Sequence, residues 1–319
     1  MNEAQPPVSL RGRDLLSAAD LSASEVELVF SRAEELKAEF RATRRHAALP
    51  LAGRTLAMLF QKPSLRTRVT FEAGMTQLGG HAVHLATSDV GVGTREAAGD
   101  VARNLDRWVD AIMVRTFGHA VAEEIAAAAV IPVINALTDL EHPCQALADL
   151  FTLHERFGAV DGLVLAFVGD GNNVYHSLAL LGARLGLEVR LAHPPGHGPD
   201  PAVVARARAI AGDAGRIVVD DDPAAVVRAA DVVYTDAWTS MGQEAEAERR
   251  RTEFARYRVN EALMAAAGPD TLVMHCLPAH RGEEISSDLL DGPRSIVLEQ
   301  AENRLHVQKG FLAESLGGR

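Results

Sequence analysis

The chain has 319 residues, of which 47% are hydrophobic and 24% charged, and its formal net charge is −11. This balance is typical of a soluble globular protein, and the length favours two domains of ordinary size. An acidic chain is a poor general nucleic-acid binder, and no apolar run approaches the roughly 20 residues that span a membrane. The N-terminus shows no apolar signal segment, and the cysteines are Cys144 and Cys276. The N-terminus and the two cysteines favour a cytoplasmic protein with two reduced thiols. The net charge and the hydropathy argue against nucleic acid and membrane as partners.

An amphipathic helix over Leu21–Ala42 is the first predicted element. Ser22 and Glu25 form a capping-box pattern at its start, and apolar residues then recur at helical spacing. Short apolar runs next alternate with helical segments, which predicts a parallel sheet with helices on both faces. The predicted strands are Thr55–Phe60, His81–Leu85, Ala111–Arg115 and Pro132–Ala136, and the predicted helices are Arg68–Leu78, Ala98–Trp108 and Ala120–Ala129.

A second series of the same kind follows a predicted helix over Pro143–Phe157. A polar, charged loop is expected over Ser240–Arg251, and a helix over Glu302–Leu316. The predicted strands of this series are Leu163–Val168, Glu188–Leu191, Arg216–Val219, Asp231–Thr235, Leu272–Met274 and Ser295–Leu298, and its predicted helices are Val174–Leu185, Pro201–Ala211, Asn260–Ala266 and Ile285–Leu290.

The two series predict an α/β fold with two domains, each a mainly parallel sheet flanked by helices on both faces, followed by a C-terminal helix. The expected limits are 1–142 for the first domain, 143–300 for the second and 301–319 for the C-terminal helix. Residues 143–157 are expected to form the linking helix of the second domain.

The first polar motif, Lys62–Arg68, reads Lys-Pro-Ser-Leu-Arg-Thr-Arg and lies between a predicted strand and a predicted helix. Free backbone N–H groups and the positive end of the dipole make a helix N-terminus a good anion site. Ser64 and Thr67 add hydroxyl donors, and Arg66 adds a planar fork that matches phosphate oxygens. Taken alone, the motif could equally be an ordinary helix cap with surface arginines.

Two further candidates lie at the ends of predicted elements. Arg115 ends a strand, where open α/β sheets place their ligands, although a surface ion pair is the plainer explanation. His142 precedes Pro143 at a predicted helix start, with Gln145 one turn on. His142 is suited to polarising a carbonyl oxygen and Gln145 to holding an amide, although a histidine before proline is more often structural.

A glycine-rich turn follows the first strand of the second half. Its Gly169-x-Gly171 pattern is followed by Val174 rather than glycine, so the dinucleotide-binding fingerprint is broken. A nucleotide site is therefore disfavoured, and Asn173 becomes a candidate for binding the carboxylate or amine of an amino acid.

Two more candidates follow later strands of the second half. Asp236 could pair with a cationic ammonium group. Cys276 is open to three explanations, as a nucleophile, a metal ligand or a packing residue, of which packing is the commonest for a buried cysteine. His275 and His280 beside it lack the paired spacing of a zinc site, so no metal is expected.

Taken together, these motifs resemble those of the carbamoyltransferase family, in order and with natural spacing from about Leu51 to about Gly310. Residues 64–68 resemble its Ser-Thr-Arg-Thr-Arg phosphate loop, and residues 142–145 resemble its His-Pro-Cys-Gln segment. The segments that resemble its ornithine-side motifs are 170–173, Asp236 with 240–242, and 275–278, and residues 302–304 resemble its late Glu-Asn-Arg.

The resemblance implies which residues form the site. Those expected to hold carbamoyl phosphate are Ser64, Leu65 through its backbone, Arg66, Thr67, Arg115, His142 and Gln145. Those expected around ornithine and the carbamoyl carbonyl are Asn173, Asp236, Ser240, Met241, Cys276, Leu277 and Arg304. Catalytic roles are implied for Arg66, Arg115, His142 and Cys276.

The implied reaction transfers the carbamoyl group of carbamoyl phosphate to the side-chain amine of L-ornithine, giving L-citrulline and phosphate, as in arginine biosynthesis. It needs no cofactor and no metal, and the family's usual state is a homotrimer or a multiple of trimers. The nearest alternatives are the same transfer to putrescine, an acylated ornithine or aspartate. More distant alternatives are a catalytically inactive scaffold on this fold and an NAD-dependent dehydrogenase.

Two positions depart from the usual family pattern. Leu65 stands where many members carry threonine, and Gly91 stands where many offer a glutamine to the neighbouring subunit's carbamoyl phosphate. Arg95 is the first cation after Gly91, so we expect Arg95, or as a second choice Thr94, to cross the subunit boundary and contact the neighbouring subunit's carbamoyl phosphate. The alternative is an ion pair of Arg95 with Glu96 or Asp100 on its own helix face.

The bond between Leu277 and Pro278 is predicted to be cis. It lies at a tight strand-to-loop turn beside Cys276, and cis peptide bonds are essentially confined to proline. Such a turn would direct the Leu277 carbonyl toward the site.

Overall fold

A computed structural model describes residues 8–212, 216–239 and 244–317 of the chain. These residues form two compact units. The first unit comprises the described residues up to Thr138 together with those from Arg304 onward, and the second comprises Asp139–Asn303.

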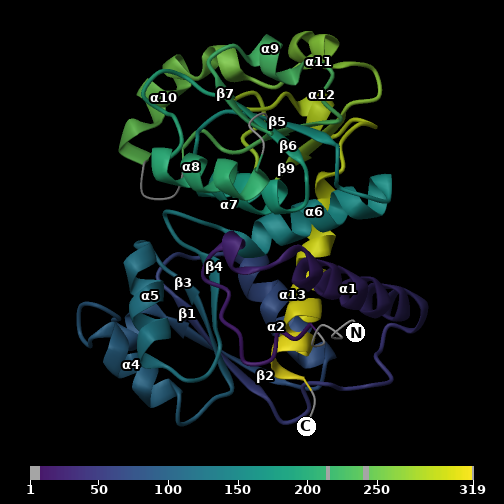
Figure 1. The fold of residues 1–319 in the computed structure, drawn as a ribbon. Coiled ribbons are helices and arrows are strands. Elements are labelled where there is room, and N and C mark those ends of the chain that lie inside the picture. The colour runs from purple at the N-terminus through teal and green to yellow at the C-terminus, as the bar shows by residue number, and fades with distance from the viewer. Residues whose placement is uncertain (1–7, 213–215, 240–243, 318–319) are drawn as a thin grey trace. The chain divides into compact units, whose positions relative to one another are not determined.

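The first unit is built on a four-stranded parallel sheet in the order β2-β1-β3-β4. Its strands are β1 (Thr55–Phe60), β2 (His81–Ala86), β3 (Ala111–Arg115) and β4 (Val133–Leu137). Its helices before the second unit are α1 (Ala23–Thr43), α2 (Leu65–Gln77), α3 (Thr87–Val90), α4 (Ala98–Leu105) and α5 (His119–Ala128). Strands β1 and β3 are buried almost throughout, so helices lie on both faces of the sheet as predicted (Figure 1).

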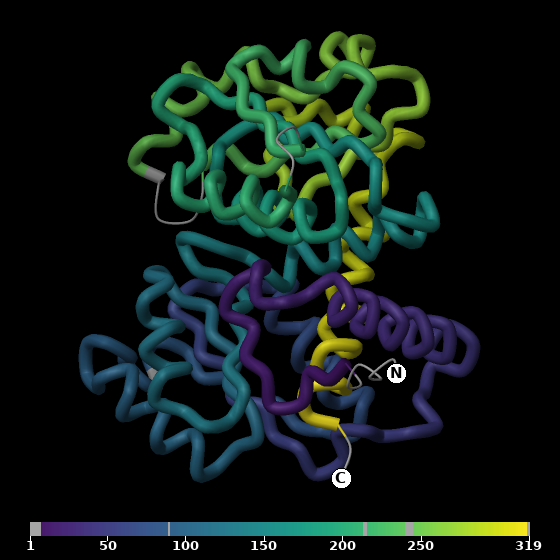
Figure 2. The backbone as a smooth tube through the Cα atoms, viewed as in Figure 1, coloured from purple at the N-terminus to yellow at the C-terminus, as the bar shows by residue number. Residues whose placement is uncertain are grey.

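Helix α1 begins where its sequence signal predicts. The Ser22 side chain accepts a hydrogen bond from the Glu25 backbone, and the Glu25 carboxylate accepts one from the Ser22 backbone. This reciprocal cap satisfies two of the donors that every helix start leaves unpaired. Figure 2 shows α1 in purple beside the yellow end of the chain, where Arg32 pairs with Glu314.

The second unit has a five-stranded parallel sheet in the order β7-β6-β5-β8-β9. Its strands are β5 (Val164–Val168), β6 (Glu188–Ala192), β7 (Ile217–Asp220), β8 (Val232–Thr235) and β9 (Leu272–His275). Its helices are α6 (Pro143–Phe157), α7 (Asn173–Arg184), α8 (Pro201–Ala211), α9 (Pro223–Val227), α10 (Ala247–Glu253), α11 (Glu261–Ala267) and α12 (Ser287–Leu290). The last helix, α13 (Val297–Leu316), begins in the second unit and ends in the first.

Strand order reverses between β5 and β8, because the chain first builds outward to β7 and then returns to the other side of β5. Open parallel sheets bind ligands at such a reversal, beyond the carboxyl ends of the strands. The segments that follow β5, β8 and β9 therefore lie where a ligand site is expected.

Two predicted elements of the second half are wrong. The predicted strand Ser295–Leu298 contributes a single bridge from Ser295 to Val273, and α13 begins at Val297. A short apolar run does not by itself distinguish a strand from a buried helix start. The predicted loop Ser240–Arg251 becomes helical from Glu244 onward, through a short 3₁₀ turn and α10. Residues 240–243 lie outside the described part of the chain.

The segment from Asp139 to His142 packs with the second unit. The backbone N–H of His142 donates to the Ser177 hydroxyl, and the Leu140 carbonyl lies 2.8 Å from Nδ1 of His176. Both contacts join this segment to α7, so it belongs with the second unit. The described residues from Arg304 onward pack in the first unit. The predicted domain limits at 142 and 300 remain predictions.

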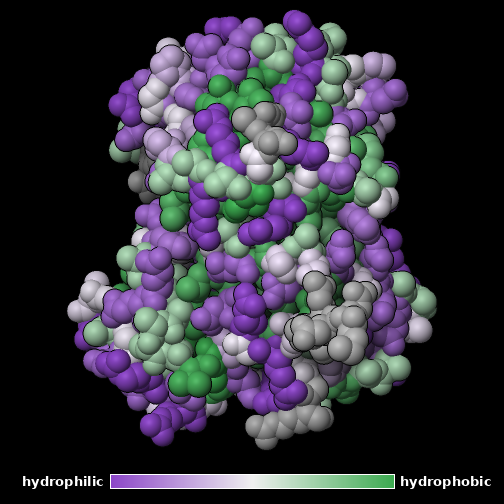
Figure 3. Space-filling model, in the orientation of Figure 1, coloured by the Kyte–Doolittle hydropathy of each residue, from purple (hydrophilic) through white to green (hydrophobic). Residues whose placement is uncertain are grey.

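Within the described residues, no helix is both long and apolar enough to cross a membrane. The face of the molecule in Figure 3 interleaves hydrophilic and hydrophobic side chains.

Candidate active site

The predicted anion motif lies at the carboxyl edge of the first sheet. Strand β1 ends at Phe60 and α2 begins at Leu65, so the motif is a strand-to-helix loop. Ser64 caps α2, because its hydroxyl accepts a hydrogen bond from the Thr67 backbone at 3.2 Å. The first turn of α2 thus presents backbone N–H groups and hydroxyls together, as an anion site requires.

Two buried arginines belong to the same unit as this loop. Arg115 is the last residue of β3, directly opposite Phe60 in the sheet register, and is 5% exposed. Arg304, on α13, is 2% exposed, and its Nη2 donates to the Thr67 hydroxyl at 3.2 Å. This contact joins Arg304 to the anion loop, and the expectation that Arg304 lies near ornithine and the carbamoyl carbonyl remains a prediction. Buried guanidinium groups at a helix start favour an anion with several oxygens.

Neighbouring residues of α2 differ in their surroundings. Leu65 is 74% exposed, so its side chain is directed to solvent and only its backbone belongs to the loop. Arg66 is half-buried, whereas the exposed Arg68 pairs with Glu72 one turn along the helix at 2.9 Å. Arg66 and Arg68 therefore differ in burial.

The segment after α3 is a tight turn at Gly91. Its φ is +66°, and a Cβ there would lie 2.7 Å from the Arg95 Cβ, so glycine is required. The Arg95 side chain is exposed, while Asp100 pairs with Arg103 and Glu96 accepts from Asn104. Within the described part of the chain, Arg95 therefore forms no ion pair with Glu96 or with Asp100.

The predicted His142–Gln145 motif forms the start of α6. His142 is the N-cap residue, Pro143 occupies the first turn, and both His142 and Gln145 are buried. The Gln145 amide donates to the Asp149 carboxylate at 2.7 Å. A rigid helix start thus holds both side chains, as binding groups require.

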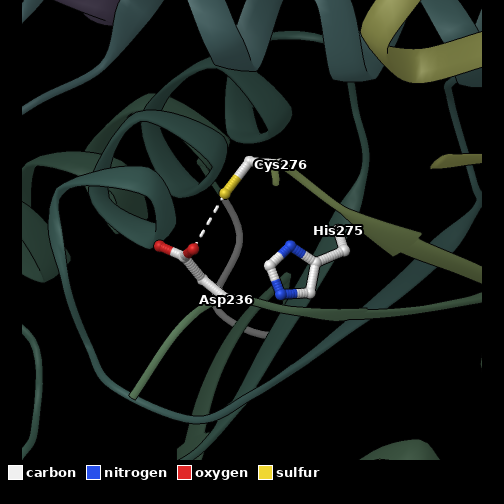
Figure 4. Close-up of side chains that lie close together, drawn as sticks. All are labelled: Asp236, His275 and Cys276. Carbon is white, nitrogen blue, oxygen red and sulfur yellow. Dashed lines mark hydrogen bonds between the residues drawn. The ribbon is translucent and has the colours of Figure 1, made fainter. Parts of the chain in front are cut away.

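In the second unit, Asp236 and Cys276 meet beyond the ends of β8 and β9. The Cys276 thiol donates to the Asp236 carboxylate at 2.9 Å, and Figure 4 shows the sulfur directed at it. The other carboxylate oxygen accepts from the Asn172 side chain at 2.8 Å. A carboxylate fixed in this way is suited to bind an ammonium group.

Asn172 was not predicted as a site residue, although its neighbour Asn173 was. Asn172 caps α7 through hydrogen bonds from the backbones of Val174 and Tyr175, whereas Asn173 is the first residue of that helix. An asparagine directly before a predicted helix is a capping signal that could have distinguished the two.

The glycine of this turn has a packing explanation. A Cβ on Gly171 would lie 2.3 Å from the backbone nitrogen of Pro199. The close approach is to another part of the chain, so the glycine needs no bound phosphate to explain it.

The peptide bond between Leu277 and Pro278 is cis, as predicted. Leu277 is half-buried and its backbone N–H donates to Nδ1 of His275 at 2.8 Å. The predicted site residues Ser240 and Met241 lie outside the described residues.

Two clusters within the described residues bring possible metal ligands within 4.8 Å of one another, namely Asp236 with His275 and Cys276, and His280 with Glu283 and Glu284. In the first cluster the groups already bond protein partners, since His275 lies between Glu284 and the Leu277 N–H. The expectation that the site holds no metal remains a prediction. Cys144 is buried in α6, and neither cysteine forms a disulfide.

Two family models match this chain. Residues 13–155 match the family model of the aspartate/ornithine carbamoyltransferase carbamoyl-P binding domain, and residues 161–314 match that of the Asp/Orn binding domain. The chain belongs to the aspartate/ornithine carbamoyltransferase family.

Relatives in the carbamoyltransferase family match this chain over nearly all of its length. The ornithine carbamoyltransferase of Anoxybacillus flavithermus is 52% identical over 97% of this chain and 98% of its own. That of Thermococcus kodakarensis is 49% identical over 98% of each.

Solved structures of carbamoyltransferases share the fold. Ornithine carbamoyltransferase from Pyrococcus furiosus has a TM-score of 0.94 and 49% identity, covering 98% of this chain and 100% of that one. Ornithine carbamoyltransferase from Thermus thermophilus has a TM-score of 0.85 and 44% identity, covering 95% and 98%. The predicted α/β fold with two parallel sheets is therefore confirmed.

Proposed function

We propose that this chain is a transferase that moves the carbamoyl group of carbamoyl phosphate to the side-chain amine of L-ornithine, giving L-citrulline and phosphate. The observation that carries the proposal is the Asp236 carboxylate, held by Asn172 and Cys276 at the ends of β8 and β9. The name ornithine carbamoyltransferase, borne by relatives 52% identical over nearly the whole chain, agrees with it.

Charge at Asp236 favours a cationic acceptor. Ornithine brings an α-ammonium group that a carboxylate attracts, whereas aspartate would bring its own carboxylates toward a like charge. Putrescine is also cationic, so Asp236 alone does not separate it from ornithine. The names of the relatives favour ornithine between these two.

In the proposed mechanism the first unit binds the phosphate. The first turn of α2 supplies backbone N–H groups and the hydroxyls of Ser64 and Thr67, while Arg66 and Arg115 supply charge. Charge grows on the phosphate as its bond to the carbamoyl carbon breaks, so fixed guanidinium groups stabilise the transition state. Arg304 holds Thr67 in place and adds a further cation.

The second unit supplies groups for the carbamoyl carbon and the amine. His142 polarises the carbamoyl oxygen, and Gln145 binds the carbamoyl amide. Asp236, Cys276, the turn at Leu277 and Asn173 surround the acceptor in this scheme. Ser240 and Met241, which lie outside the described residues, are further proposed contacts of the acceptor. Aligning two substrates in this way removes much of the entropic barrier without a covalent intermediate.

The attacking amine must be neutral. Its ordinary pKa of about 10.4 makes the neutral form about 4–5 kcal/mol unfavourable at pH 7, at about 1.36 kcal/mol for each pH unit. Asp236 binds the α-ammonium group in this scheme, and the departing phosphate accepts the proton of the attacking amine.

An assay of acceptors tests the proposal. The purified chain with carbamoyl phosphate should form citrulline from ornithine and react at least about 100-fold less efficiently, per kcat/KM, with putrescine, N-acetylornithine and aspartate. A preference for any of the other three would replace ornithine as the substrate, and inactivity with all four would overturn the transferase assignment.

A matched pair of variants tests the role of Asp236. Asp236→Asn should raise the KM for ornithine about 10-fold or more, because it removes a charge-assisted contact, and should leave carbamoyl phosphate binding unchanged. Asp221→Asn, an exposed acid after β7, should change neither. Equal effects of the two variants would contradict the role of Asp236.

Three further statements complete the proposal. The chain forms a homotrimer or a multiple of trimers, acts in the cytoplasm, and serves arginine biosynthesis. The anabolic label of the Pyrococcus furiosus relative supports the last of these. Sedimentation equilibrium tests the first, and a mass that is not a multiple of three 34.1 kDa chains would contradict it.

A further inference from the structure

Asp149, on α6, is a fully buried carboxylate that accepts hydrogen bonds from at least three side chains. Its Oδ1 accepts from the amides of Gln145 and Gln300, each at 2.7 Å, and its Oδ2 accepts from the Tyr234 hydroxyl at 3.1 Å. All four residues are at most 1% exposed. A buried carboxylate is costly unless it is well hydrogen-bonded, and three converging donors meet that condition.

This contact determines the orientation of the Gln145 amide. A carboxylate oxygen accepts and an amide nitrogen only donates, so the Gln145 NH₂ must face Asp149. Its carbonyl oxygen, Oε1, is therefore turned away from the Asp149 carboxylate. If the Gln145 side chain were rotated by half a turn, two acceptor oxygens would meet in a dry interior.

Neighbouring donors lock the same arrangement. The Gln300 carbonyl oxygen accepts from the His275 N–H at 3.0 Å, so the Gln300 NH₂ faces Asp149 and Tyr234. Burial, reinforced by the nearby Asp149 charge, raises the pKa of Tyr234 well above its usual value, so the hydroxyl keeps its proton to donate. Every member of the network has one allowed direction.

We propose that Asp149 is a positioning residue, which turns the Gln145 carbonyl oxygen toward the NH₂ group of carbamoyl phosphate. The site then prefers carbamoyl phosphate to acyl phosphates that lack this NH₂ group. This inference rests on the proposed function, in which Gln145 binds the carbamoyl amide. Carbamoyl and acetyl groups have nearly the same shape, but the first has NH₂ where the second has CH₃. Only a correctly placed hydrogen-bond acceptor separates them.

The size of the preference follows from desolvation. A carbonyl oxygen that binds an N–H in a buried site is left unsatisfied beside a methyl group. Such an unsatisfied acceptor costs about 1–3 kcal/mol, which corresponds to a preference of about 5- to 150-fold. Loss of the orienting carboxylate should remove most of that preference without removing the phosphate contacts of the first unit.

The experiment compares acetyl phosphate with carbamoyl phosphate. The selectivity ratio is the Ki of acetyl phosphate, as a competitive inhibitor, divided by the KM of carbamoyl phosphate with ornithine as acceptor. Asp149→Ala should lower this ratio about 10-fold. Asp149→Asn, which keeps one acceptor oxygen, should restore part of it, and Tyr234→Phe should leave it within about 3-fold of the wild type because the Gln145 contact is intact.

Each outcome is decisive. If Asp149→Ala keeps the wild-type selectivity ratio and the wild-type thermal stability, the inference about Asp149 is wrong but the proposed function stands. If the selectivity ratio falls equally in Asp149→Ala and Tyr234→Phe, the network has a general packing role and the inference is wrong as well. A wild-type chain that forms no citrulline would overturn the proposed function as well.

A measurement on the wild type covers the case in which Asp149→Ala does not fold. Phosphonoacetamide, in which a methylene replaces the bridging oxygen of carbamoyl phosphate, can be bound in crystals of the unaltered chain. Its amide nitrogen should lie within hydrogen-bond distance of Oε1 of Gln145 while Nε2 still contacts Asp149. A ligand that contacts Nε2 instead, or lies out of reach of Gln145, would overturn the inference.

Discussion

Arg66 and Arg68 lie two positions apart in the first turns of α2, and in the proposed function only Arg66 binds the phosphate. We predict that Arg66→Ala lowers the affinity for carbamoyl phosphate about 10- to 150-fold, since each charge-assisted hydrogen bond contributes about 1.5–3 kcal/mol. Isothermal titration calorimetry measures this directly.

Arg68→Ala is the matched control for that variant. Arg68 pairs with Glu72 on the helix surface, where such a pair contributes only about 0.3–0.5 kcal/mol. The affinity of the Arg68→Ala variant for carbamoyl phosphate should therefore equal that of the wild type. If both variants lose affinity equally, a general basic surface rather than Arg66 binds the anion.

In the proposed function, the protonation of the ornithine side-chain amine controls how kcat depends on pH. Because ornithine is mostly protonated at pH 7 and must react as the neutral amine, kcat should rise with pH and then level off. The rise should be close to tenfold for each pH unit at the acidic end. Steady-state kinetics at saturating substrates test this, and a kcat that is flat between pH 6 and 9 would show that amine deprotonation does not control the rate.

At the scale of elements, the buried Lys309 of α13 contacts residues of the first unit. Nζ of Lys309 lies 3.0 Å from Nε2 of His46 and 3.0 Å from Oε1 of Gln77, above the ring of Phe40. Burial lowers the pKa of Lys309 to about 8, although the charge of Glu39 opposes this. The fully buried amine therefore links three helices that are distant in sequence.

This pKa predicts how stability depends on pH. Between pH 8 and about 10.5 the unfolded chain holds the Lys309 proton more tightly than the folded chain, so the contribution of Lys309 to stability rises with pH across that window. Below pH 8 both states are charged and the cost of burying the charge is fully present. Relative to Lys309→Met, the wild type should gain up to about 3 kcal/mol between pH 7.5 and 10.5, at about 1.36 kcal/mol for each pH unit. Urea unfolding at several pH values measures the difference, and a difference that stays constant would contradict the prediction.

Local sequence signals predicted most elements because each signal lies within the element it describes. The continuous apolar runs at Thr55–Phe60 and Ala111–Arg115 became β1 and β3 with the predicted ends, and the Asp200-Pro201 start of α8 was equally clear. The run at Ser295–Leu298 failed because its helical continuation depends on packing: Ile296 and Val297 are buried while Leu298 is 77% exposed.

At the scale of the whole molecule, Arg95 tests whether active sites are shared between subunits. Its exposed side chain follows the tight turn at Gly91, in the segment that the resemblance places beside the neighbouring carbamoyl phosphate. We predict that Arg66→Ala and Arg95→Ala chains are each nearly inactive, and that mixing them restores some activity, because mixed oligomers contain sites with both arginines intact.

Several measurements complete that experiment. Refolding the two variants together should restore up to about a quarter of wild-type activity if chains assemble at random and each site draws on two subunits. Arg103→Ala, which removes the partner of Asp100 on the same surface, is a control that should stay active. Wild-type turnover and KM in Arg95→Ala would show that the segment is only a connection.

The sequence alone determined the fold class, and it predicted the strand-to-helix loop at 64–68, the helix start at 142–145, and Asp236 and Cys276 as candidate site residues. Each of these depends on a few consecutive residues at the junction of a strand and a helix, where local patterning decides the structure. Tertiary structure alone decided which of these groups meet. Asn172 bonds Asp236 across 64 positions, and Arg304 bonds Thr67 across 237. Such contacts depend on the order of the strands in each sheet and on the face along which α13 packs, which no local pattern carries.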